Sequence, residues 1–514
     1  MSQPWYEDRP PPRPAPGNPY APAGFGPPPP PGPYRGRRRG PLVAGLLALA
    51  LLTGVGGYVL GARGGPDPSA AAPTATPSGR PPATAAPGPA TARPGPQRTR
   101  VPGNDEIARK RLSGEASAWI VDDRTDLPRR QIRTEDLWIV GDTAVQAVYK
   151  KVVAHRLSDG AELWSVALPT PVCETPVHPT PDGKVVIVLQ NVEAWTGTRC
   201  NRLQMIDLRK GTAGWHKRLV ETGGTDDTIM VDTAITGGTL AVVQSMSAAA
   251  YRVDDGNKLY DIPMEQPGRC HPGRVAGGIR LLVLDDCAIT AGAKAYAGLR
   301  ELDPETGKVR WRYRTAPGRV IGQVLSEEPV VITTPTRENG AKDWRIVALG
   351  PGGKALRTID PRPKGFTHCG DSVDTSSNAQ ACAQAVVGPG IVVLGGTDRV
   401  GAYDLATGRL AWGVKSEATS YGYFPLRAVP GKVGFVHELG TSSRPGRIFR
   451  IGPGGVDTMK DVLKLPVATA PYEFGMGVLG ERAYAGDRLV LTPANLDGDD
   501  ARREPRMLSF APAP

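Results

Sequence analysis

Short apolar runs rich in β-branched residues recur from about residue 105 to the C-terminus. The clearest are 185–189, 240–243, 281–284, 330–332, 391–394, 433–436 and 489–491. Each run is bounded by Gly, Pro or Asp, and helical periodicity is absent apart from a short stretch at 104–112. Apolar runs of this length between turn residues are typical of buried strands. The pattern therefore predicts an all-β domain over residues 105–514.

A tight turn followed by an aromatic residue recurs between these strands. Its clearest copies are Asp303-Pro-Glu-Thr-Gly-Lys-Val-Arg-Trp311 and Asp404-Leu-Ala-Thr-Gly-Arg-Leu-Ala-Trp412, and a weaker copy is Asp207…Gly211…Trp215. The turn glycines are Gly160, Gly211, Gly256, Gly307, Gly352, Gly408 and Gly454, with spacings of 51, 45, 51, 45, 56 and 46 residues. Self-similarity at roughly 40–50 residues indicates a propeller or a solenoid.

The number of repeats predicts a β-propeller of about eight four-stranded blades, with seven as the alternative. Seven glycine turns are visible, and strand-like segments at 488–491 and 507–510 remain beyond the last one. An additional strand, Ala118–Val121, precedes the first unit. Pairing this N-terminal strand with the C-terminal strands would close the ring and leave no free sheet edge.

The repeat resembles the PQQ-like β-propeller repeat, whose blades carry Asp-x-x-Thr-Gly-x-x-x-Trp. The resemblance implies that a Trp docks each blade onto its neighbour, and the candidate docking residues are Trp164, Trp215, Tyr260, Trp311 and Trp412. Tyr260, Leu356 and Thr458 depart from the Trp of the repeat. The family includes quinoprotein alcohol dehydrogenases, which hold a quinone and calcium, and non-catalytic BamB-type assembly proteins.

The first 104 residues have a different composition. Residues 1–40 are rich in Pro and end in an Arg cluster, which predicts a disordered tail. Residues 41–62 lack any charge and would rise about 33 Å as a helix, enough to cross a bilayer. The arginines place the N-terminus in the cytoplasm. Residues 63–104 predict an extracytoplasmic Pro/Ala/Thr-rich linker. A cleaved signal peptide is the rival interpretation of the apolar run.

The positive charge of the chain belongs mainly to this N-terminal part. Residues 1–100 carry eleven Arg against Glu7, Asp8 and Asp67, a net +8, which leaves +3 of the total +11 for all later residues. A domain so close to neutral does not predict nucleic-acid binding.

All six cysteines follow the apolar run, on the side predicted to be extracytoplasmic. Their spacing favours disulfides between sequence neighbours, namely Cys173–Cys200, Cys270–Cys287 and Cys369–Cys382. A metal site is the alternative, because His271 and His368 adjoin cysteines. No Cys-x-x-Cys spacing supports it.

These features predict a single-pass plasma-membrane protein whose outer propeller is a non-catalytic scaffold for protein interaction or envelope assembly. Its expected partners are an envelope or extracellular protein, or a small ligand, and no catalytic, cofactor-binding or metal-binding residue is assigned. The alternatives are a sensor of an extracellular ligand and a quinone-dependent dehydrogenase. The sequence contains no adjacent cysteine pair of the kind that contacts the quinone in those enzymes.

Overall fold

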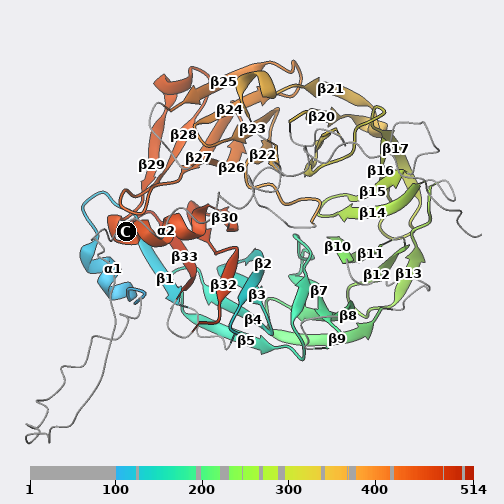
Figure 1. The fold of residues 1–514 in the computed structure, drawn as a ribbon, viewed down its shortest axis with the longest axis horizontal. Coiled ribbons are helices and arrows are strands. Elements are labelled where there is room, and N and C mark those ends of the chain that lie inside the picture. Colours follow the sequence, from blue (N-terminus) through green and yellow to red (C-terminus); the bar gives the residue numbers. More distant parts are fainter. Residues whose placement is uncertain are drawn as a thin grey trace, which may run out of the picture. The chain divides into compact units, whose positions relative to one another are not determined.

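Strands that follow one another in the sequence pair antiparallel, so that each sheet is a small meander. The computed structural model describes residues 100–122, 127–192, 198–219, 231–245, 247–265, 270–287, 296–336, 342–366, 368–369, 378–416, 422–478, 480–499 and 504–513. Residues 93–514 belong to one of the two units of the chain. Within this unit the sheets stand as blades around a ring, which Figure 1 shows in face view.

The first four blades are formed by β2 to β17. They contain β2 (Gln131–Val140), β3 (Thr143–Val148), β4 (Lys151–Arg156) and β5 (Glu162–Ala167); β6 (Val172–Glu174), β7 (Lys184–Gln190), β8 (Cys200–Asp207) and β9 (Thr212–Arg218); β10 (Val231–Thr236), β11 (Thr239–Gln244), β12 (Ser247–Arg252) and β13 (Lys258–Asp261); and β14 (Cys270–Ala276), β15 (Leu281–Cys287), β16 (Tyr296–Leu302) and β17 (Val309–Arg314). In each blade the first strand is innermost and the fourth is outermost (Figure 1).

The remaining blades continue the same order. They contain β18 (Val324–Glu327), β19 (Val330–Thr333), β20 (Ile346–Leu349) and β21 (Ala355–Ile359); β22 (Ala385–Gly388), β23 (Ile391–Gly395), β24 (Arg399–Asp404) and β25 (Leu410–Lys415); β26 (Tyr423–Val429), β27 (Val433–Glu438), β28 (Arg447–Ile451) and β29 (Lys460–Lys464); and β30 (Arg482–Ala485), β31 (Arg488–Leu491), β33 (Pro505–Ala511) and β1 (Ser117–Asp122). The short β32 (Asn495–Asp497) pairs with the start of β2.

The ring has eight blades, and the eighth is closed by strands from both ends of the domain. β1 pairs with β33 from Ser117↔Ala511 to Asp122↔Pro505, so the predicted N-terminal closing strand is confirmed. The eight-blade prediction is confirmed and the seven-blade alternative is wrong. Only seven glycine turns are visible in the sequence because the third and fourth strands of the last blade belong to opposite ends of the domain.

Apolar strands fill the space between adjacent blades. In β7, five consecutive residues are buried, and in β11 all six residues are buried. The outermost strands alternate instead, as in β17, where every second residue is exposed. The continuous apolar runs seen in the sequence therefore correspond to inner strands that are covered on both faces.

The repeated turn is held by its own aspartate. Asp303 Oδ1 accepts hydrogen bonds from the backbone N–H of Thr306 at 2.9 Å and from its hydroxyl at 2.9 Å. Asp404 makes the same two bonds to Thr407, at 2.7 and 2.9 Å. Gly307 and Gly408 then adopt φ of 71° and 72°, a left-handed conformation that glycine reaches without strain. The hydrogen bond from Arg310, followed by those from Thr306, lowers the pKa of Asp303 to about 2.

Aromatic side chains dock successive blades onto these turns. A Cβ atom on Gly211 would lie 2.4 Å from the ring of Trp164, and one on Gly307 would lie 2.5 Å from Tyr260. Only glycine therefore permits the observed contact. Trp215 also packs on the next glycine turn, and its indole N–H donates to Val253 O at 2.7 Å. Trp311 lies on Gly353 rather than on Gly352, the glycine identified in the sequence.

The side chains that dock one blade onto the next differ in the later blades. Trp412 is 4% exposed and donates to Lys432 O at 2.6 Å. Leu356, which departs from the repeat, is 61% exposed, and its neighbour Arg357 packs on the next glycine turn and donates to Ala406 O at 3.0 Å. Trp119 of the closing strand packs on Gly160, so one more tryptophan docks a blade than the sequence pattern indicates.

The helices are short and lie outside the blades. They are α1 (Asn104–Lys110) and α2 (Ala470–Gly477), with single 3-10 turns at η1 (Pro351–Gly353), η2 (Arg362–Lys364), η4 (Gly455–Thr458) and η5 (Val467–Thr469). The stretch at 104–112 is helical as expected, but α2 was not predicted. None of the helices formed by the described residues is long and apolar enough to cross a membrane. The predicted tail, apolar span and most of the linker lie outside the described residues.

Candidate functional site

The two faces of the ring differ in the length of their connections. One face, here called the turn face, carries the connections between first and second strands, such as 141–142 and 486–487, and those between third and fourth strands, such as 303–308. The opposite face, here called the loop face, carries longer connections, including 334–345, 360–384, 465–481 and 492–504. Binding residues concentrate on loops held by a rigid scaffold. The loop face is therefore the candidate interaction surface.

All three disulfides lie at this loop face. The structure joins Cys173–Cys200, Cys270–Cys287 and Cys369–Cys382, the three neighbour pairs expected from the spacing. The first joins the loop-face ends of β6 and β8, and the second joins the paired ends of β14 and β15. The third lies within the connection 360–384 between the fifth and sixth blades. Each bond thus restrains a loop-face connection rather than joining distant blades.

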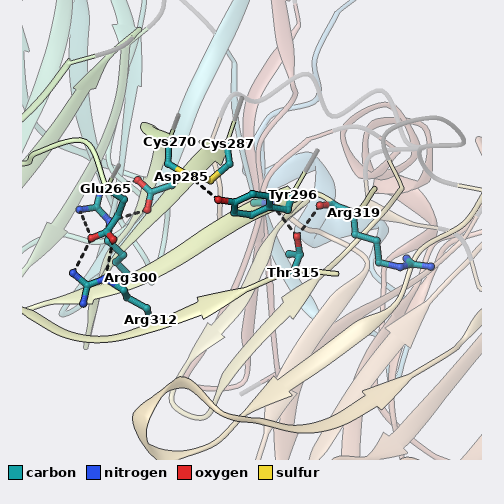
Figure 2. Close-up of a disulfide and its surroundings, with 10 residues drawn as sticks. Glu265, Cys270, Asp285, Cys287, Tyr296, Arg300, Arg312, Thr315 and Arg319 are labelled. Atoms are coloured by element: carbon teal, nitrogen blue, oxygen red, sulfur yellow. Dashed lines mark hydrogen bonds and ion pairs between the residues drawn. A yellow bond between two sulfur atoms is a disulfide. The ribbon is translucent and has the colours of Figure 1, made fainter. Parts of the chain in front are cut away.

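The Cys270–Cys287 disulfide contacts a tyrosine and lies in the same blade as a buried ion pair (Figure 2). The Tyr296 hydroxyl lies 3.5 Å from Cys270 Sγ, and Arg314 stacks over the Tyr296 ring at 3.6 Å from its centroid. In the same blade, Arg300 is 1% exposed and binds both carboxylate oxygens of Asp285, at 2.6 and 2.7 Å. Burial raises the pKa of Asp285, although its bonds to Arg300 oppose that rise.

Glu265 extends this ion pair toward solvent. It lies 3.4 Å from Arg300 Nη1 and accepts two hydrogen bonds from Arg312, at 2.8 and 2.9 Å. Arg312 lowers the pKa of Glu265, which keeps that carboxylate ionised. Among the described residues, Asp285, Arg300, Glu265 and Arg312 therefore form one connected ion-pair network in this blade (Figure 2).

A second cluster lies inside the ring, where a loop-face connection reaches the turn face. Gln380, from the connection 360–384, donates from Nε2 to Gly277 O at 2.9 Å and also to Glu327 Oε1. Its Oε1 accepts the Gly277 N–H at 2.8 Å. His178 Nε2 lies 3.2 Å from the same Gln380 nitrogen.

The topology places this cluster at the centre of the ring. Glu327 is the last residue of β18, and Gly277 directly follows β14, so both lie at the turn-face ends of innermost strands. His178 lies between β6 and β7, three blades away from β18. One side chain can contact the second, fourth and fifth blades together only by crossing the interior. Burial raises the pKa of Glu327 to about 7.

The predicted site residues form no single centre. The cysteines are joined in three separate pairs, and the docking aromatics are distributed around the ring. Sequence reasoning missed Gln380, Glu327 and His178. The signal that could have pointed to them is the glycine pair 277–278 at a strand end together with the unusually long connection 360–384.

The histidine that adjoins Cys369 contacts a tryptophan and a threonine. His368 packs edge-on against Trp344, with ring centroids 5.2 Å apart, and its Nε2 lies 2.9 Å from Thr333 Oγ1. Across the part of the chain that the structure describes, no group of three or more His, Cys, Asp or Glu is arranged to hold a metal ion.

Residues 118–276 match a family model described as "Outer membrane protein assembly factor BamB", which represents PQQ-like repeats. The chain carries the PQQ-like propeller repeat. This agrees with the turn and docking geometry, which are the features on which the sequence resemblance was based. A comparison with curated proteins finds no match.

Two solved structures are similar to this PQQ-like propeller chain. BamB from Moraxella catarrhalis shares 13% identity at a TM-score of 0.44, with 77% of this chain and 98% of that chain covered. Quinohemoprotein alcohol dehydrogenase from Comamonas testosteroni shares 13% identity at a TM-score of 0.43, with 81% and 79% covered. The eight antiparallel sheets themselves define the propeller fold.

A quinone with calcium does not fit the described residues of this PQQ-like propeller. No two cysteines are adjacent, and all six are joined in pairs 13 to 27 residues apart. The turn-face end of the ring interior is occupied by Gln380 and its partners. We therefore derive no reaction through such a group.

Proposed function

We propose that the protein is a membrane-anchored, extracytoplasmic scaffold that docks other proteins on its loop face and performs no catalysis. The observation that carries this proposal is the presence of all three disulfides at that face. A disulfide restrains a loop before binding, which lowers the entropy lost when a partner orders it. The anchor would be residues 41–62, with the N-terminus in the cytoplasm and residues 63–104 as the spacer.

The family match supports a role in assembly rather than in chemistry. The matched family is described as an outer membrane protein assembly factor, so a scaffold in envelope assembly is the function that it favours. The Arg312–Glu265 ion pair in this blade also supports docking, because a surface held in place before binding loses less conformational freedom when a partner binds.

Photocrosslinking in cells can test which face is used, because both faces carry exposed apolar residues. On the loop face, Val192 is 46% exposed and Val467 is 48% exposed. On the turn face, Ile279 is 70% exposed and Val456 is 63% exposed. A photoreactive residue at either loop-face position of the full-length chain should give discrete protein adducts, and the turn-face positions should not.

The same adducts should be lost when the loop face is perturbed. Replacing both Cys173 and Cys200 by Ser should weaken adducts from Val192 more than protein abundance falls, because Cys200 starts the strand that follows the connection carrying Val192. Adducts that arise only from Ile279 and Val456, or equally from all four positions, would contradict loop-face docking.

Sensing of an extracellular ligand is a second candidate function, favoured by a cleft at the loop face. The cleft has a volume of about 410 Å³, within the usual range for small-molecule sites. Its lining includes Glu438, Arg444 and Arg447, together with Leu112 from the segment that precedes the ring. Ligand-dependent thermal stabilisation that Arg447→Ala abolishes would support sensing over scaffolding.

A further inference from the structure

The carboxamide of Gln380 is held by groups that match it atom for atom. Its oxygen faces a donor, the Gly277 N–H at 2.8 Å. Its nitrogen donates to Gly277 O at 2.9 Å and to Glu327 Oε1, and it lies 3.2 Å from His178 Nε2, which accepts in the tautomer that is protonated at Nδ1. These groups from Gly277, Glu327 and His178 are here called the axial cradle.

The backbone around the axial cradle is shaped to bring these groups close together. A Cβ on Gly277 would lie 2.4 Å from Ile235 O of the neighbouring blade, so only glycine fits there. Gly278 has φ of 116°, and a Cβ on it would lie 3.0 Å from Glu327 Oε2 and 3.1 Å from His178 Cδ2. The Gly278 N–H donates to Ile235 O at 2.7 Å, which fixes the strand end. The groups of the cradle therefore come from the second, fourth and fifth blades, with support from Ile235 of the third, and none comes from the connection 360–384.

We propose that the ring axis carries a binding site for a primary carboxamide and that Gln380 occupies this site within the same chain. The ligand class follows from the donor and acceptor pattern. A carboxylate of the same shape would place an oxygen against Gly277 O, Glu327 and His178, where it has no hydrogen to donate. An ammonium group would match the acceptors but would leave the Gly277 N–H without a partner.

The axial cradle is also accessible from the turn face. The Glu327 side chain is 13% exposed, and the His178 side chain is 42% exposed. A primary amide, such as a glutamine side chain of another protein, could therefore enter from that side if Gln380 were absent. This site is distinct from the proposed loop-face docking surface, since it lies at the turn-face end of the ring interior.

Chemical rescue of the full-length chain tests the proposal. Gln380→Gly deletes the side chain, and propionamide reproduces the deleted atoms. The variant should melt at a lower temperature than the wild type, and propionamide should recover most of that loss in a saturable way. Propionate, which lacks the N–H donors, should recover little. Wild-type protein should not respond to either compound, because its cradle is already filled.

Matched variants distinguish this site from a general effect of the additive. Gln384→Gly removes a second glutamine from the same connection and should not respond to propionamide. If Gln380→Gly fails to fold, recovery of folding by propionamide supports the proposal equally. Gln380→Ala keeps Cβ, so acetamide supplies the missing atoms and repeats the test on a milder variant. Absence of rescue in both Gln380 variants, equal rescue by propionate, or rescue of Gln384→Gly would overturn the proposal.

Discussion

The buried ion pair between Arg300 and Asp285 gives the most quantitative prediction. Both side chains are 1% exposed, and two hydrogen bonds of 2.6 and 2.7 Å join them. Arg300→Met keeps most of the side-chain volume but leaves Asp285 without its cation. Removing one partner of a buried pair costs about 3–5 kcal/mol, because the remaining charge is uncompensated. We expect a loss of that size in the free energy of unfolding at pH 7.5.

The pH dependence identifies the cause of this loss. Burial already raises the pKa of Asp285, and removal of Arg300 raises it further. A carboxyl group whose pKa is raised by folding binds its proton more tightly in the folded state. The stability lost in Arg300→Met should therefore become smaller as the pH is lowered and Asp285 becomes protonated. Asp285→Asn in the same background should restore part of the stability at pH 7.5, since it removes the buried charge.

Urea unfolding followed by tryptophan fluorescence provides the measurement. The free energy of unfolding is taken from the first transition of each curve and compared between variants. Arg156→Met is the matched control, because Arg156 pairs with Asp159 at 2.9 Å with the two side chains 44% and 52% exposed. That exposed pair should contribute less than about 1 kcal/mol. A cost for Arg300→Met as small as the control, or one that does not change with pH and is not relieved by Asp285→Asn, would refute the reasoning.

Three further predictions concern docking, cross-linking and protonation. Trp311→Ala should lower the free energy of unfolding in urea by about 2 kcal/mol, less than the loss expected for a fully buried tryptophan, because Trp311 is only partly buried. Leu356→Ala, at the equivalent but exposed position, should leave the free energy of unfolding almost unchanged. Serine at both Cys369 and Cys382 should lower stability by roughly 3 kcal/mol, and reductant should then have less effect on the variant than on the wild type. Burial raises the pKa of Glu327 from 4.5 to about 7. The wild type should therefore lose up to roughly 3 kcal/mol of folding stability as the pH rises through that range. Glu327→Gln, which cannot ionise, should become more stable relative to the wild type over the same range.

The blades could be predicted from sequence because their chemistry is local. Asp303 bonds to residues two and three positions ahead of it, and the glycine turn closes within six residues. Such a turn leaves the same pattern in the sequence wherever it occurs. The closing strand was predictable for a different reason, since Ala118–Val121 and the C-terminal strands were the only strand segments without a blade.

Docking was predicted less completely because it depends on the neighbour as well as on the repeat. Leu356 occupies the tryptophan position yet points to solvent, and the aliphatic part of Arg357 covers the next turn instead. The sequence alone does not distinguish these two outcomes, because a long arginine stem can cover a turn as well as an aromatic ring can.

The axial cradle could not be predicted because its contacts join positions far apart in the sequence. Gln380 contacts residues that are 53, 103 and 202 positions away. None of these residues repeats from blade to blade, so no periodic pattern identifies them. Their types also have ordinary structural roles, and a lone glutamine in a long connection carries no signature of a ligand site.

The position of Gln380 limits how this propeller can interact with other molecules. The connection that carries it starts at the loop face and reaches the turn-face ends of β14 and β18, so the axis at that level is filled by the chain itself. A partner docked on the loop face, as we propose, would therefore meet the disulfide-restrained connections rather than a channel open through the ring. The same connection joins Cys369–Cys382 at one face to the axial cradle at the other. Displacement of Gln380 would consequently be felt at the proposed docking face, which links the two sites through one covalent segment.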